Sequence, residues 1–247
     1  MTDRLFLGQI IMNKQEAKIR IVKLKEEINY HNYLYHVFDK LDISDAVFDS
    51  LKNELEELER KWPEFITSDS PTQRVSGSPL EEFKKVGHDV PMMSLFDAFG
   101  EQELRDWEER IKKILPGIKF DYFSELKMDG LSVSLVYKDG IFFSGSTRGD
   151  GKIGEDVTQN IRTIGSIPLK LRLPLVAELK KDGLSSEQIK KLLSAINSGK
   201  IEVRGEAIMS KKVFEELNRK YKKEEKALLA NPRNGAAGSI QIGRAHV

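Results

Sequence analysis

The N-terminal part of the chain has the spacing of apolar residues that an amphipathic helix requires. Between residues 13 and 38 there is no proline or glycine, and lysines and glutamates separate the apolar positions Ile19, Val22, Ile28 and Leu34. This pattern predicts one long helix. Ser44 or Asp45 can cap a second amphipathic helix, predicted over 45–61. The two helices predict a hairpin whose polar connection is a possible site.

The pattern changes after this hairpin. Residues 66–100 are rich in proline, glycine and serine, which predicts a linker. An amphipathic helix is predicted over 101–114. Apolar and small residues then alternate over 131–137, and a returning strand follows over 141–146. Lys138-Asp139-Gly140 lies between them, so a β-hairpin is predicted.

These elements predict an α+β fold with two domains. Residues 186–197 are expected to be helical, and residues 201–206 are expected to form a further strand. We therefore expect a small helical domain over residues 1–67 and a mainly antiparallel sheet domain over residues 68–240. Residues 171–199 carry no site-like side chains and are interpreted as a surface excursion from the second domain.

Composition narrows the class of protein. Hydrophobic residues make up 39% and charged residues 32%, and no apolar run approaches the ~20 residues of a membrane span. The absence of cysteine excludes disulfides, thiol nucleophiles and cysteine-based zinc sites within these residues. These features predict a soluble cytoplasmic protein without membrane partners. The net charge of +1 argues against a wholly basic DNA-binding surface but permits a local basic patch.

The segment Ser-Glu-Leu-Lys-Met-Asp-Gly at 124–130 is the first candidate for chemistry. If it is extended, Glu125, Lys127 and Asp129 share one face, and the two apolar residues Leu126 and Met128 face the core. A free lysine is protonated at neutral pH, so nucleophilic attack requires a change of environment, which a divalent cation and a polyphosphate can supply. Taken alone, the motif is short, and a lysine between two acids is often only a surface ion pair.

A second candidate is the glycine-rich segment Ser-Thr-Arg-Gly-Asp-Gly at 146–151. Its glycines allow backbone to approach a ligand closely, and the planar guanidinium of Arg148 suits phosphate or ribose oxygens. The simpler interpretation is a tight hairpin turn with an exposed arginine.

Two further segments carry charged side chains in a regular arrangement. Glu202, Arg204 and Glu206 alternate along a predicted strand and therefore share a face. Residues 231–239 are mostly small and open a predicted helix, whose N-terminus suits phosphate, and Arg233 adds positive charge there. A capped helix start is the simpler interpretation of this last segment.

In this order, the four segments resemble the adenylation domain of bacterial NAD-dependent DNA ligases, a nucleotidyltransferase with an antiparallel, ATP-grasp-like sheet. The motifs that carry the resemblance are Glu-Leu-Lys-Met-Asp-Gly, Thr-Arg-Gly-Asp-Gly, Glu-Val-Arg-Gly-Glu and Ala-Asn-Pro-Arg-Asn-Gly-Ala-Ala-Gly-Ser. The first motif also fits ATP-dependent ligases and RNA-capping enzymes. The other three are more specific to the NAD-dependent branch.

The N-terminal hairpin separates these branches further. Tyr-Leu-Tyr-His at 33–36 and Ile-Ser-Asp-Ala-Val-Phe-Asp at 43–49 are similar to the small domain of NAD-using ligases, which binds the nicotinamide mononucleotide (NMN) half of NAD. Oxidised nicotinamide is a flat cation, for which an aromatic face and carboxylates are suitable partners. Phe48 departs from the tyrosine that is common in the family.

The resemblance implies a role for each matching residue. Lys127 would attack the α-phosphorus of NAD, form a phosphoramidate with AMP and expel NMN. Asp129 would orient or neutralise this lysine. Glu125 would accept a hydrogen bond from the adenine amino group, with Ser94 and Leu95 lining the same pocket.

The remaining implied contacts are with the sugar, the phosphates and the nicotinamide half. Arg148 and Glu206 would contact the AMP ribose, and Arg233 would contact phosphate. The residues expected to hold the NMN half are Tyr35, His36, Asp45 and Asp49. The resemblance also implies NAD and Mg²⁺ as cofactors, a zinc site only in later domains, and nicked duplex DNA as the partner of a monomeric enzyme.

The resemblance ends at Ile240. Residues 241–247 do not resemble the family, and we interpret them as a non-native tail such as a translated sequencing adapter. An adenylation domain that ends there would be incomplete and is expected to seal nicks poorly or not at all. An ATP-dependent relative is disfavoured by the N-terminal hairpin. An inactive truncated nucleotide-binding module is disfavoured by the intact Lys127, Glu125 and Glu206.

Overall fold

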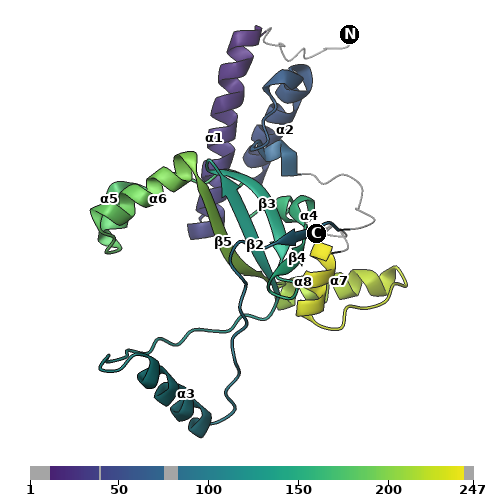
Figure 1. Ribbon diagram of the computed structural model, residues 1–247. Coiled ribbons are helices and arrows are strands. Elements are labelled where there is room, and N and C mark those ends of the chain that lie inside the picture. Colours follow the sequence, from purple (N-terminus) through teal and green to yellow (C-terminus); the bar gives the residue numbers. More distant parts are fainter. Residues whose placement is uncertain (1–11, 39, 75–82, 242–247) are drawn as a thin grey trace, which may run out of the picture.

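A computed structural model describes residues 12–38, 40–74 and 83–241 of the chain. The predicted helical hairpin is present, with α1 at Lys14–Phe38 and α2 at Asp45–Lys61 (Figure 1). The sequence offered two candidates, Ser44 and Asp45, for the N-cap of the second helix. In the structure Ser44 is the N-cap, and its hydroxyl accepts a hydrogen bond from the Val47 amide at 3.4 Å.

The inner face of α1 contains only two of the four apolar positions named from the sequence, Ile28 and Leu34. Ile21, Leu24 and Ile28 are buried against α2, whereas Ile19 is 51% exposed and Val22 is 49% exposed. The buried residues are spaced by three and four positions and so form a single stripe along a helix. The prediction for Ile19 and Val22 was therefore wrong, because they lie beside this stripe.

Residues 66–74, the described start of the predicted linker, contact both the hairpin and the second part of the chain. The buried carboxylate of Glu59 accepts hydrogen bonds from Ser70 at 2.7 Å and from Thr72, and it pairs with Lys25 at 3.3 Å. These partners satisfy a charge that would otherwise be costly to bury. Four residues on from Ser70, Arg74 donates to the carbonyl oxygens of Ile164 and Ile167 at 3.0 and 2.9 Å.

The second part of the chain is built on an antiparallel sheet with the strand order β3-β2-β5. These strands are β2 at Leu131–Lys138, β3 at Ile141–Thr147 and β5 at Lys200–Ala207. Asp139 and Gly140 both have positive φ, 51° and 74°, as a tight hairpin turn requires. The predicted hairpin and the predicted third strand are thus confirmed. A second, unpredicted pair joins β1 at Lys85–Gly87 to β4 at Ile153–Glu155.

The helices of this part lie at several places around the sheet (Figure 1). The predicted α3 at Glu101–Ile114 and α6 at Ser186–Ser198 are present. The excursion near 171–199 contains α6 and the short α5, Val176–Lys181, which extend from the end of the sheet where β5 begins. The helices α4, α7 and α8 lie at Thr158–Arg162, Lys211–Lys223 and Pro232–Gln241, and two 3₁₀ helices lie at Pro63–Phe65 and Pro71–Arg74.

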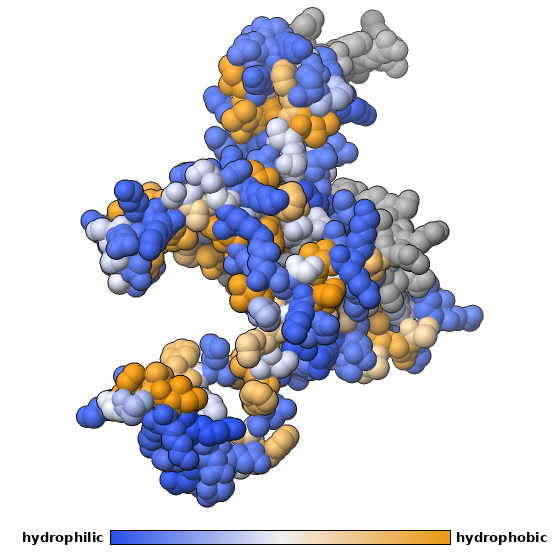
Figure 2. Space-filling model, in the orientation of Figure 1, coloured by the Kyte–Doolittle hydropathy of each residue, from blue (hydrophilic) through white to orange (hydrophobic). Residues whose placement is uncertain are grey.

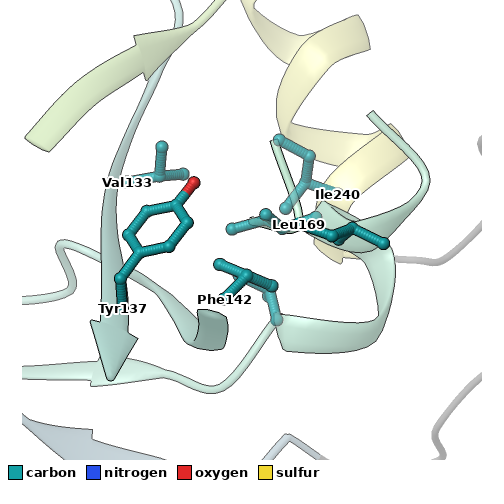
Figure 3. Packing of buried hydrophobic residues seen from close by; sticks show 7 residues of the cluster. Val133, Tyr137, Phe142, Leu169 and Ile240 are labelled. Atoms are coloured by element: carbon teal, nitrogen blue, oxygen red, sulfur yellow. The ribbon is translucent and has the colours of Figure 1, made fainter. Parts of the chain in front are cut away.

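One apolar cluster lies between the sheet, α4 and α8 and includes Val133, Tyr137, Phe142, Leu169 and Ile240 (Figure 3). The rings of Tyr137 and Phe142 meet edge to face, with centroids 5.6 Å apart. The Tyr137 hydroxyl donates to the Pro168 carbonyl oxygen at 2.9 Å, so its polar atom is satisfied. Burial raises the pKa of Tyr137 to about 12.

Residues 93–129, here named the α3 arm, project away from the sheet (Figure 1). No residue of α3 is buried, and apolar side chains gather on the side of the arm that faces the body (Figure 2). Leu126 is 87% exposed and Met128 is 49% exposed, so the prediction that both face a core was wrong. Residues 125–129 are all exposed, and sheet pairing begins only at Leu131, where β2 meets Ala207.

Two further findings concern residues outside the core. Among the described residues, no helix is both long enough and apolar enough to cross a membrane. Gln241 ends α8, and residues 242–247, the rest of the predicted non-native tail, lie outside the described residues.

Candidate functional site

A pocket of about 920 Å³ opens where the base of the α3 arm meets the sheet. Five regions of the sequence contribute to its wall: β1, the α3 arm with the start of β2, the end of β3 with the following turn and β4, the end of β5, and α8. Seven predicted site residues line it, namely Ser94, Leu95, Lys127, Asp129, Arg148, Glu206 and Arg233. The fold therefore brings together residues that are more than a hundred positions apart in the sequence.

The strand pairing places Glu206 at the pocket. Ser132 of β2 lies opposite Glu206 of β5, and the Ser132 hydroxyl donates to the Glu206 carboxylate at 2.6 Å. Two positions along β2, the Ser134 hydroxyl donates to the Glu202 carboxylate at 2.7 Å. The predicted common face of the β5 charges is therefore present, with Arg204 between the two glutamates.

The glycine-rich segment forms a tight turn that presents Arg148 to the pocket. Gly149 has a φ of +56°, and a Cβ at Gly149 or Gly154 would overlap a backbone carbonyl oxygen across the turn. The Asp150 carboxylate accepts from the amides of Ile153 and Lys152, both at 2.8 Å, which holds the pKa of Asp150 below its usual value. The segment is therefore a tight turn, as in the simpler interpretation. The same turn also places the Arg148 guanidinium in the pocket.

Arg148 and Arg233 line the pocket from different elements, the β3–β4 turn and α8. The Arg148 guanidinium donates to the Ser94 hydroxyl at 3.2 Å. Arg233 pairs with Asp129 at 3.4 Å, with both side chains more than half exposed. Such an exposed pair contributes little stability, but it brings a second cation close to the lysine motif. Asn231 caps α8 by accepting from the Asn234 amide at 2.7 Å, so the simpler interpretation of this segment also holds.

Lys127 and Glu125 are placed differently by the structure. Lys127 is exposed and lines the pocket, whereas Glu125 is exposed and is not among the described lining residues. The predicted shared face of these two side chains required a regular strand. The segment before Gly130 instead belongs to the α3 arm and has no strand pairing in the described part of the chain.

Gly130 explains why the motif ends in glycine. It is buried at the start of β2, and a Cβ there would overlap the backbone carbonyl of Ala207 and lie 2.9 Å from the Ile208 side chain. A larger residue must therefore push β2 and β5 apart, directly beside Lys127.

We expect Gly130→Ala to lower the free energy of unfolding by about 1–3 kcal/mol, because the new methyl group overlaps backbone that cannot move aside cheaply. Chemical denaturation followed by circular dichroism measures this loss. Gly205→Ala is the matched control, since a Cβ at Gly205 of β5 meets nothing within 4 Å. Equal stability of the two variants would contradict the steric explanation.

A second pocket, of about 370 Å³, lies between the end of α1 and the start of α2. Tyr35, His36, Asp45 and Phe48 line it, but Asp49 is not among its described lining residues. The rings of Tyr35 and His36 meet edge to face, with centroids 4.9 Å apart. Burial lowers the pKa of His36, and the nearby charge of Arg74 lowers it further, so both favour the neutral ring.

The two pockets are separate in this arrangement and share no described lining residue. The His36 ring lies against the loop after α4, where a Cβ at Gly165 would be 3.3 Å from its Nε2 atom. The Arg172 guanidinium lies over the Tyr33 ring at 4.9 Å. The end of α1 is thus docked on residues 165–172, not over Lys127.

Some pocket residues were missed by sequence reasoning. Lys85, Asp97 and Gln241 also line the larger pocket. They belong to β1, the α3 arm and the end of α8, and no spacing rule links such distant residues. Among the described residues, no group of three or more histidine, aspartate or glutamate side chains could hold a metal ion by itself.

Two family models match the chain. The family model for the NAD-dependent DNA ligase adenylation domain matches residues 80–245, and the model for the DNA ligase-like N-terminal NAD⁺-binding domain matches residues 14–76. Among curated relatives, the protein named DNA ligase from Carboxydothermus hydrogenoformans is 44% identical over 230 residues, which is 93% of this chain and 31% of that protein.

Two other relatives give the same result. The proteins named DNA ligase from Anoxybacillus flavithermus and a Thermoanaerobacter species are 46% and 49% identical over 92% of this chain. The chain spans about 30% of the length of each. The resemblance noted in the sequence and the α+β fold class are confirmed. The chain belongs to the NAD-dependent DNA ligase family and carries its N-terminal NAD⁺-binding domain and its adenylation domain.

Proposed function

We propose that the chain takes up AMP from NAD on Lys127 and releases NMN. The whole protein would then pass this AMP to the 5′-phosphate of a nick in duplex DNA and join it to the 3′-hydroxyl. The observation that carries the proposal is that Lys127 shares one pocket with Arg148, Glu206 and Arg233. We further propose a monomeric cytoplasmic enzyme that serves DNA replication and repair.

The chemistry follows from this set of side chains. The Lys127 amine, once deprotonated, forms a bond to the α-phosphorus, and the bond from that phosphorus to the pyrophosphate bridging oxygen breaks, so that NMN leaves with the electron pair. Phosphoryl transfer of this kind depends mainly on positioning and on neutralising the phosphate charge. Arg148 and Arg233 supply positive charge, and Asp129 would orient the lysine.

The other contacts would hold the nucleotide. One oxygen of the Glu206 carboxylate accepts from Ser132, which leaves its second oxygen for a ribose hydroxyl. Ser94 and Leu95 would border the adenine. The Asp129 carboxylate would hold Mg²⁺ together with the substrate phosphates, because this ion is usually bound by one or two carboxylates and phosphate oxygens. When bound, Mg²⁺ would neutralise charge on the phosphates.

The second pocket would take the NMN half. Tyr35 and Phe48 offer aromatic surface and Asp45 offers a carboxylate, which together suit a flat cation. Asp49 lies four residues on from Asp45, on the same helical face, and would contact the NMN half once the hairpin has moved over Lys127. Because the two halves of NAD are covalently joined, the hairpin must leave residues 165–172 and move towards Lys127 for both pockets to bind one molecule.

We expect NAD, but not ATP, to transfer AMP covalently to the chain, and Asp45→Ala to slow this transfer. Loss of a charged contact of this kind costs about 1.5–3 kcal/mol, or roughly 10- to 100-fold. The measurement is the mass gain of one AMP in the intact protein as a function of time and nucleotide.

Asp182→Ala, in an exposed turn after α5, is the control and should label like the unaltered chain. Labelling by ATP would instead indicate a relative of the ATP-dependent ligases. Absence of labelling by either nucleotide would indicate an inactive nucleotide-binding module.

A further inference from the structure

Residues 88–94, here named the crossing segment, run from the end of β1 to the nucleotide pocket without belonging to a helix or strand. Two backbone bonds attach the segment to the β3–β4 turn, from His88 to Lys152 at 2.9 Å and from Met92 to Gly151 at 2.8 Å. Met92 is buried and Asp89 pairs with Lys200 of β5, but Val90 is 60% exposed and Pro91 is exposed. The two exposed residues gain little from apolar burial, so their path depends on polar contacts.

Arg204 of β5 supplies those contacts. Its Nη1 atom donates to the Pro91 carbonyl oxygen at 3.0 Å, its Nη2 atom donates to the Val90 carbonyl oxygen, and its Nε atom donates to Glu202 at 2.8 Å. All three nitrogens of the guanidinium are used, and the side chain is only one-third exposed. The geometry matches the planar donor set of arginine, which a lysine cannot reproduce.

Glu202 keeps this guanidinium in place. Its carboxylate also accepts from Ser134 of the neighbouring strand, and the hydrogen bonds from Arg204 and Ser134 both lower the pKa of Glu202. Glu202 is therefore ionised at neutral pH, and the bond from Arg204 is charge-assisted and strong. Arg204 is not among the described residues that line the nucleotide pocket.

The crossing segment ends at the pocket wall. Ser94 accepts from Arg148 at 3.2 Å, and the His88 ring nitrogen Nε2 lies 3.1 Å from the Arg148 carbonyl oxygen. Both ends of the segment therefore contact the residue that presents a cation to the pocket. A shift of Val90 and Pro91 would move Ser94 and Leu95 relative to Arg148.

We propose that Arg204 is a positioning residue for adenylyl transfer, which holds Val90 and Pro91 on the sheet so that Ser94 and Leu95 form the wall of the nucleotide pocket. The inference rests on the proposed function, because it takes this pocket to be the AMP site. Its effect falls on nucleotide binding more than on the reacting atoms, since Lys127 lines the pocket and Arg204 is not among its described lining residues.

The test compares Arg204→Lys and Arg204→Ala with the unaltered chain and with Arg219→Ala, an exposed arginine of α7. Hydrogen–deuterium exchange of peptides that cover residues 88–95 reports on the crossing segment independently of activity. We expect exchange of the Met92 amide to rise at least about tenfold in both Arg204 variants, because the loss of charged hydrogen bonds frees the segment. The unfolding midpoint of each variant is measured to check that it folds. If Arg204→Ala does not fold, Arg204→Lys, which keeps a positive charge at this position, still tests the inference.

The second measurement is AMP transfer to the chain as a function of NAD concentration. We expect the half-saturating NAD concentration to rise roughly tenfold, with a smaller change in the maximal rate. Unchanged exchange, or unchanged NAD dependence in a chain that takes up AMP, would overturn the inference. If the unaltered chain takes up no AMP, the proposed function fails, and the exchange data still decide whether Arg204 holds the crossing segment.

Discussion

Replacing Lys127 with alanine is expected to abolish covalent transfer of AMP from NAD to the chain. The phosphorus–nitrogen bond requires an amine at this position, and no water or neighbouring hydroxyl can form the same product. Lys127→Arg should also fail, because a guanidinium stays protonated at every accessible pH and is a poor nucleophile. Intact-mass measurement after incubation with NAD detects the adduct or its absence.

The controls for this prediction come from the same arm. Lys119→Ala removes another exposed lysine of the α3 arm and should leave labelling unchanged. Lys127 is exposed and lies outside the buried clusters, so its removal should not alter the unfolding midpoint. An AMP adduct that persists in Lys127→Ala would assign the nucleophile to a different residue.

The second large effect concerns stability. We expect Phe142→Ala to lower the free energy of unfolding by about 3–5 kcal/mol, and Trp107→Ala to lower it by less than about 1 kcal/mol. Phe142 is 1% exposed at the centre of the sheet cluster, and truncation leaves a cavity beside Tyr137. Trp107 is 43% exposed on an arm helix without buried residues, so little packing is lost.

Urea denaturation followed by far-ultraviolet circular dichroism measures both losses without depending on the tryptophan signal. Phe142→Leu is an intermediate control, since it keeps most of the buried volume and should cost less than the alanine variant. A loss for Trp107→Ala as large as that for Phe142→Ala would show that the α3 arm is packed against the body in solution.

Much of the fold could be predicted because its signals are local. The helix over 101–114 and the Asp139-Gly140 turn each depend on neighbouring residues and were found where expected, and the second helix is capped by Ser44, one of its two candidates. The inner face of α1 was predicted only in part, because periodicity identifies several apolar stripes and only packing selects one. The short β1 and β4 were missed, because three-residue strands carry almost no pattern.

The sequence by itself determined the family, the order of its motifs and the set of side chains from which a nucleotide site would be built. Only the tertiary structure decided which of them meet: Lys127, Arg148, Glu206 and Arg233 share a pocket, whereas Glu125 stays outside it. It also separated the two pockets and attached Arg204 to Pro91, more than a hundred residues away in the chain. The physical reason is that the periodicity of the sequence indicates which face of a helix or strand a side chain occupies. The partners of that side chain depend on which distant segment covers that face.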